Sequence, residues 1–286
     1  HLGHPAAITP NLDKVVREDA ISFSNAFCQA TVCTPSRCSF MTGWYPHTHG
    51  HRTMNYMLHS SQGDPNILSE LKKNDYFIWW GGSNDLIAGQ EGYKSHCDIY
   101  FEPTQKDFKR WNYDLQEGTH EGNLSWRGQE DGDNFFSFFK GKLDKKEKDK
   151  YFDDDWSMVY GALDLINNYE KKDPFCLFLP LSYPHPPYCV EEPWYSLIDR
   201  NKIPGRYEYT NWKDKPSLLK GILDGQKMQN WSEKQWRELR AVYLGMCARV
   251  DHQFGLLIDS LKIKNIYDNS LIIFLSDHGD FTGDYG

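Results

Sequence analysis

Three short apolar runs, each followed by a loop rich in polar residues, constrain the fold of this chain most strongly. They span residues 76–80, 175–179 and 271–275, and segments with a helical spacing of apolar residues lie between them. Runs this short and this apolar are typical of strands buried on both faces, as in parallel sheets covered by helices. The alternation predicts an α/β fold with a mostly parallel sheet sandwiched by helices. Alternating residues predict a further short strand over 21–26.

Helix-start signals flank these strands. Thr9 and Pro10 suit the N-cap and first helical positions of a helix that ends near residue 19. Further helices are expected over residues 66–73, 156–169 and 232–261. In the last of these, Ser232 is the expected N-cap and Gln235 occupies the capping-box position.

Three consecutive carboxylates, Asp153, Asp154 and Asp155, precede the helix expected over 156–169. Carboxylates at a helix start accept hydrogen bonds from unpaired N–H groups and complement the helix dipole. We interpret the triplet in this way. A metal-binding cluster is the alternative interpretation.

The segment Cys-Thr-Pro-Ser-Arg, from Cys33 to Arg37, carries the strongest functional signal. Pro35 fixes its own φ and disfavours a helical Thr34, so an extended chain is expected there, with a helix opening at Ser36. Cys33 would then lie near a helix N-terminus, which favours anions. Arg37, one turn into the helix, could reach back to Cys33, and its guanidinium fork suits an oxyanion. The simpler interpretation is a buried thiol followed by an ordinary helix start.

The spacing Cys-x-Pro-x-Arg, followed by Thr-Gly-Trp-Tyr-Pro-His-Thr-His-Gly over residues 42–50, resembles the signature of type I sulfatases. The Thr-Pro-Asn-Leu-Asp of residues 9–13 is also similar to that family. The resemblance implies an alkaline-phosphatase-like sandwich. It also implies that a maturation enzyme oxidises Cys33 to formylglycine, whose hydrate attacks sulfur while Arg37 holds it.

Two loops after expected strands match the family in part. Where the family has a lysine that contacts sulfate, this chain has Ser83 or Gly82. Ser83 is the expected substrate-binding residue, and a simple turn is the alternative interpretation. His185, between prolines, resembles the family's sulfate-contacting histidine, and we expect it to bind sulfate or to protonate the leaving alcohol. A rigid Pro-rich loop with an incidental histidine is the alternative. Such loops gather at the carboxyl edge of an open α/β sheet.

A third loop, Ser-Asp-His-Gly-Asp over residues 276–280, resembles the family's metal-binding element. Asp277 and His278 are expected to bind a divalent cation, Ca²⁺ or alternatively Mg²⁺, which would polarise a sulfate oxygen. Calcium prefers oxygen ligands, so His278 is an imperfect fit. A strand-end turn is the alternative interpretation.

The family pattern begins with a strand bearing paired acidic metal ligands and ends with a smaller sheet domain. Neither is found here, so we interpret residues 1–286 as one sulfatase catalytic-domain fragment, truncated at both ends. Localisation stays open, with a preference for the cytoplasm, because a targeting signal would precede His1.

Charge and cysteine usage restrict the partners. The net charge of −8 argues against nucleic acid and anionic membrane surfaces, and no apolar run approaches the length of a membrane span. The seven cysteines lack the spacing of a disulfide framework, so we expect mostly reduced, packed thiols.

These features predict a sulfuric ester hydrolase acting on a small-molecule or glycan sulfate ester. A phosphonate or phosphodiester hydrolase of the same superfamily, with the same nucleophile, is one alternative. A non-catalytic protein that binds sulfated ligands is the other, and Ser83 in place of lysine favours it.

Overall fold

A parallel sheet lies at the centre of the fold. The computed structural model describes residues 3–59, 63–89, 92–113, 127–130, 132–143, 151–207 and 212–285. The sheet has the order β2-β1-β4, with all neighbours parallel, and its strands are Ile99–Phe101, Phe77–Gly81 and Phe175–Phe178. A second, two-stranded parallel sheet pairs β3 with β5, which are Phe139–Lys142 and Tyr188–Val190. The predicted α/β fold with a parallel sheet is confirmed.

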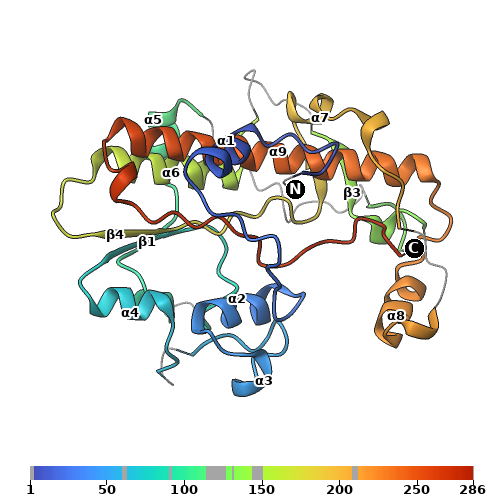
Figure 1. Ribbon diagram of the computed structural model, residues 1–286, viewed down its shortest axis with the longest axis horizontal. Helices are drawn as coiled ribbons and strands as arrows, with labels where there is room; N and C mark the ends of the chain where they lie inside the picture. Colours follow the sequence, from blue (N-terminus) through green and yellow to red (C-terminus); the bar gives the residue numbers. More distant parts are fainter. Residues whose placement is uncertain are drawn as a thin grey trace.

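Helices cover the main sheet on both faces (Figure 1). On one side, α6 (Asp154–Asn168) packs against β1 and against the long α9 (Glu233–Ile263). On the other side, α4 (Ile67–Lys73) packs against β1 and contacts α2 (Cys33–Thr42). This sandwich leaves the ends of the strands open to the loops that follow them.

The remaining elements are short. The other α-helices are α1 (Pro10–Glu18), α3 (Pro46–His49), α5 (Gln105–Trp111), α7 (Trp194–Leu197) and α8 (Ser217–Gln226). Short 3₁₀ helices span Gly92–Ser95, Phe135–Ser137, Arg200–Lys202, Trp212–Asp214 and Tyr267–Asn269. No helix of the described residues combines the length and the hydropathy needed to cross a membrane.

A hydrophobic core between the main sheet and the helices α4 and α2 holds these two helices in place. Ile78 and Trp80 of β1 are fully buried, and they cluster with Leu68 of α4 and with Cys38 and Met41 of α2. Burying one large apolar side chain contributes about 1.5–3 kcal/mol, so this cluster fixes α2 against the sheet. The position of α2 matters because its first residue is Cys33.

Two predicted helix starts are confirmed by their caps. At α9, the Ser232 side chain accepts from the N–H of Gln235, and the Gln235 side chain accepts from the N–H of Ser232. At α6, Asp153 accepts from the N–H of Trp156 at 3.0 Å. These bonds satisfy N–H groups that have no partner within the helix.

Helix α1 begins where the sequence predicts, but its cap comes from elsewhere. Thr9 is the N-cap residue and its side chain makes no capping bond. Instead, the carboxylate of Asp251 on α9 accepts from the N–H groups of Asn11 and Leu12, at 3.1 and 2.8 Å. The helix start therefore depends on a residue about 240 positions later in the chain.

The conformation predicted before residue 36 is wrong. Helix α2 begins at Cys33, and its first regular bond runs from the N–H of Ser36 to the carbonyl of Val32. Thr34 is helical rather than extended. The first-turn N–H groups of a helix have no intrahelical partner, so Pro35 costs no hydrogen bond there. Cys33 is thereby the first helical residue.

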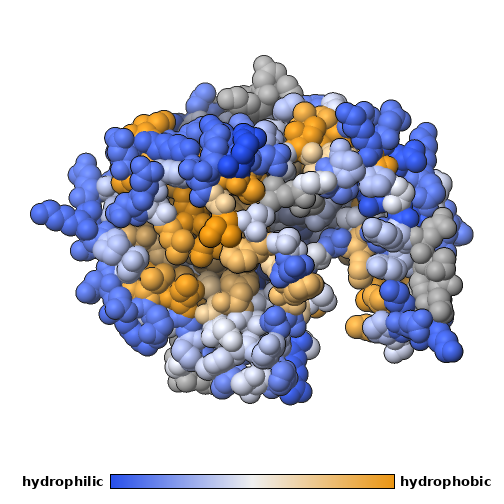
Figure 2. Space-filling view, viewed as in Figure 1, coloured by the Kyte–Doolittle hydropathy of each residue, from blue (hydrophilic) through white to orange (hydrophobic). Residues whose placement is uncertain are grey.

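Two predicted strands are also wrong. Residues 21–26 and 271–275 pair with no strand among the described residues. Their side chains are exposed, Phe23 to 78% and Leu271 to 89%. Figure 2 shows apolar side chains gathered on the face of the molecule that Figure 1 turns toward the viewer. A strand is defined by pairing with a neighbour, which an apolar run cannot guarantee by itself.

Candidate active site

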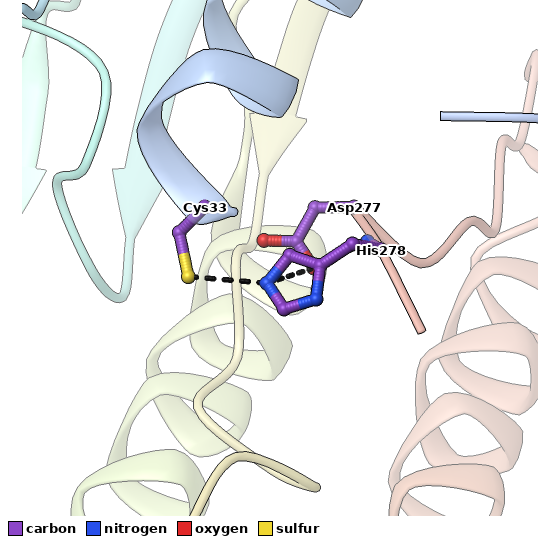
Figure 3. A group of neighbouring side chains, drawn as sticks. All are labelled: Cys33, Asp277 and His278. Carbon is purple, nitrogen blue, oxygen red and sulfur yellow. Dashed lines mark hydrogen bonds and ion pairs between the residues drawn. The ribbon is translucent and has the colours of Figure 1, made fainter. Parts of the chain in front are cut away.

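The N-terminus of α2 and the loop at residues 276–280 meet in space. The sulfur of Cys33 lies 3.3 Å from Nε2 of His278, and the imidazole points toward it (Figure 3). The hydroxyl of Ser36 donates to the backbone carbonyl of Asp277, which joins the loop to the first turn of α2. Potential metal-ligating atoms of Cys33, Asp277 and His278 lie within 4.8 Å of one another.

The two nitrogens of His278 have different partners. Nδ1 lies 2.8 Å from the carbonyl of Gly279, and a carbonyl can only accept, so Nδ1 carries a hydrogen. The hydrogen bond with Cys33, the carbonyl of Gly279 and the charge of Asp277 raise the pKa of His278 to about 9, against the effect of burial. His278 is therefore mostly a cation at neutral pH, with Nε2 placed to exchange a proton with the side chain of residue 33.

Arg37 joins two loops of the site to α2. Its Nε donates to Oδ2 of Asp277 at 3.0 Å, and its Nη1 donates to Oγ of Ser83 at 2.7 Å. The same Nη1 lies 3.2 Å from Oδ2 of Asp85. No side-chain hydrogen bond among the described residues joins Arg37 to Cys33. The guanidinium is therefore held in place by Asp277, Ser83 and Asp85 rather than by the side chain of Cys33.

The loop that carries Ser83 is fixed against the loop after β4. Gly82 has φ +122°, and a Cβ added there would lie 2.2 Å from the carbonyl oxygen of Pro180. The N–H of Ser83 donates to that same carbonyl at 3.1 Å. Only glycine fits this close approach. The two loops at the carboxyl edge therefore hold Ser83 in position for Arg37.

Sequence reasoning missed Asp85 and Ser36. Asp85 lies two positions after Ser83 in the same strand-end loop, and a carboxylate there was a signal for a cationic partner. Ser36 lies inside the motif, where its helical position could have indicated a contact one turn from Cys33. Both act through groups distant in sequence, since Asp85 pairs with Arg37 and Ser36 bonds to Asp277.

The structure does not join His185 to this group. His185 is exposed, and its Nδ1 lies 2.6 Å from the carbonyl of Pro186. No hydrogen bond or ion pair among the described residues links it to Cys33. The start of its loop is held firmly, because the buried carboxylate of Asp155 accepts from the N–H groups of Ser182 and Tyr183, each at 2.8 Å.

The acidic triplet has a structural role wider than the one predicted. Asp153 caps α6, as predicted, and also pairs with the buried Arg249. Arg249 lies 3.2 Å from Glu191 as well. Burial raises the pKa of Glu191, an effect that the charge of Arg249 opposes. Among the described residues, the triplet is not one of the groups that could hold a metal ion.

The donors beside Cys33 fit a hard cation only in part. Asp277 supplies a carboxylate, but its Oδ2 already pairs with Arg37, and the other donors are an imidazole and a thiol. Calcium prefers six to eight oxygen ligands. These three side chains alone therefore do not make a calcium site.

A parallel sheet between helices, with a polar cluster at its carboxyl edge, is an α/β architecture of the alkaline-phosphatase-like class. The sulfatase family model matches residues 1–285, and the chain belongs to this family. An ulvan-active sulfatase of Formosa agariphila is 26% identical over 99% of this chain and 48% of its own length.

Other similar proteins extend the comparison. A multifunctional alkaline phosphatase superfamily protein of Trinickia caryophylli is 24% identical over 98% of this chain and 59% of its own length. The crystal structure of a phosphonate monoester hydrolase of Agrobacterium radiobacter superposes with a TM-score of 0.72 at 21% identity, covering 99% of this chain and 60% of that one. The chain thus spans about half to three fifths of the length of these proteins.

Proposed function

We propose that this protein hydrolyses sulfate monoesters with residue 33 as the nucleophile. The carrying observation is the position of Cys33, at the first residue of α2 and 3.3 Å from Nε2 of His278. The helix N-terminus favours an anionic group there. Family membership supports the same reaction class.

We further propose that Cys33 is converted to formylglycine by a maturation enzyme. Once formed, the hydrated aldehyde would supply the attacking oxygen. The carbonyl of Gly279 keeps the ring of His278 oriented with Nε2 toward residue 33, so Nε2 would be the nitrogen offered to a cation once it has lost its proton. Arg37 would orient the ester, since Asp277 and Ser83 already fix its guanidinium. His185 would bind sulfate or protonate the leaving alcohol after movement of its loop.

A divalent cation is part of this proposal. Asp277 and His278 would be two of its ligands, with Ca²⁺ first and Mg²⁺ as the alternative. The cation would polarise an ester oxygen. The other oxygen ligands would come from outside this pair of residues.

The substrate class proposed is a small-molecule or glycan sulfate ester. Similarity to an ulvan-active sulfatase supports it. The second candidate is hydrolysis of a phosphonate or phosphodiester with the same nucleophile. A non-catalytic ligand-binding protein is the third, favoured by Ser83 where the family has a lysine. Turnover of an aryl sulfate, of an aryl phosphodiester, or of neither separates the three.

The decisive experiment is peptide mass spectrometry on protein of natural length, co-produced with a formylglycine-generating enzyme. The peptide with residue 33 should carry an aldehyde in place of the thiol, and Cys33→Ala should abolish turnover. Cys28→Ala is the matched control, because Cys28 is exposed and its loss should leave activity unchanged. Full activity with an unmodified Cys33 would contradict the formylglycine proposal.

A further inference from the structure

The charge around Arg37 is unusual for a residue expected to bind an anion. Asp277 pairs with its Nε at 3.0 Å and Asp85 pairs with its Nη1 at 3.2 Å. The arginine side chain is only 12% exposed, whereas those of Asp85 and Asp277 are 30% and 23% exposed. One guanidinium thus pairs with two carboxylates when no ester is bound.

Asp85 is held at this position by the build of its loop. The side chain of Asn84 accepts from the N–H of Ile87 at 3.0 Å, which closes a turn around Asp85. Gly82 brings the start of the loop against Pro180. The loop therefore holds the carboxylate of Asp85 against Arg37, next to the neutral hydroxyl of Ser83.

A second carboxylate changes which anions the arginine favours. Sulfate monoesters, phosphodiesters and phosphonate monoesters carry one negative charge, whereas phosphate monoesters carry two at alkaline pH. Each unit of charge on the ligand is repelled separately by Asp85, so the doubly charged ester has the larger penalty. Asp277 belongs to the proposed cation site, whereas Asp85 reaches the site only through Arg37.

We propose that Asp85, through its ion pair with Arg37, makes the site selective for singly charged ester groups over doubly charged ones. This inference rests on the proposed function and names a specificity-determining residue for it. Asp85 acts through Arg37 by lowering the positive charge that an ester meets.

The test compares one anion of each charge on the same protein at pH 8. Binding of methyl sulfate and methyl phosphate is measured by thermal stabilisation, and turnover is measured with 4-nitrophenyl sulfate and 4-nitrophenyl phosphate. Asp85→Asn should raise the preference for the doubly charged member of each pair by about tenfold, the scale of one partly exposed charge at this range. The ratio is insensitive to the fraction of protein that folds.

Two further variants control the result. Asp85→Glu keeps the charge and should change the ratio by less than about twofold. Glu70→Gln removes an equal charge from an exposed pair with Lys73 on α4 and should leave the ratio unchanged. If Asp85→Asn does not fold, Asp85→Ser, which also removes the charge, takes its place and should shift the ratio in the same direction.

An unchanged ratio in Asp85→Asn, or an equal shift in Asp85→Glu, would overturn the inference. Anion binding with the expected ratios but without turnover would overturn only the proposed function. Failure of the wild-type protein to bind either anion would overturn both.

Discussion

Arg249 and Arg37 each pair with two carboxylates, in very different surroundings. Arg249 is fully buried, and its partners Asp153 and Glu191 have side chains 4% and 5% exposed. Arg37 is 12% exposed, and its partner carboxylates are 23% and 30% exposed. Each cluster has one positive and two negative side chains, but water reaches the cluster around Arg37 and not the one around Arg249.

That difference separates a structural cluster from a site. The buried cluster joins α9, the start of α6 and the end of β5, and an incoming anion cannot reach it. Water and a ligand can reach the partners of Arg37, so its pairs can rearrange when an ester binds. A buried charge left without its partner is costly, whereas an exposed pair contributes about 0–1 kcal/mol. Substitution of Arg249 should therefore mainly lower stability, whereas substitution of Arg37 should mainly lower activity.

The largest expected effect is on stability, at the buried arginine. Arg249→Met leaves the carboxylates of Asp153 and Glu191 buried without a counter-charge, which should lower the free energy of unfolding by about 3–5 kcal/mol. Urea denaturation measures it. Arg17→Gln, on the exposed pair with Glu18, is the control and should cost about 1 kcal/mol or less. A small loss in Arg249→Met would show that the cluster is hydrated.

The next effect is on activity, at Arg37. Arg37→Gln should lower the free energy of unfolding by less than Arg249→Met does, because Asp85 and Asp277 stay in contact with water when their partner is lost. It should lower kcat/KM for an aryl sulfate by about 100-fold, as loss of one oriented donor does in other active sites. Arg37→Lys should recover only part of this, since an ammonium cannot span Asp277 and Ser83 as the fork does. Wild-type kcat/KM in Arg37→Gln would exclude Arg37 from the reaction.

The smallest expected effect is on the local stability of the loop that carries His185, which the buried Asp155 holds. Asp155→Asn leaves the N–H of Ser182 or Tyr183 without an acceptor, which should cost about 1–3 kcal/mol. Hydrogen exchange at these two amides should accelerate in the variant. Asp154→Asn is the matched control, because Asp154 is exposed on the same turn of α6. Equal exchange rates in the two variants would mean that Asp155 does not hold the His185 loop.

Local patterns in the sequence were sufficient for much of the fold. The strands near residues 76–80 and 175–179 and the capped starts of α6 and α9 are confirmed. These features depend on neighbours within a few positions, which the sequence displays directly. The strand predicted over 271–275 is wrong because pairing depends on a distant segment.

The sequence by itself determined the residue types of the site and the family to which the chain belongs. It placed Cys33 near a helix start and Ser83 in a loop after a strand, and both positions are confirmed. Only the tertiary structure decided their partners. Arg37 finds Ser83 across 46 positions of the chain and Asp277 across 240. The pairing of Asp85 with Arg37 likewise depends on the loop after β1 lying against α2. The sequence does not show it, because electrostatic interactions depend on distance in space and on access to water.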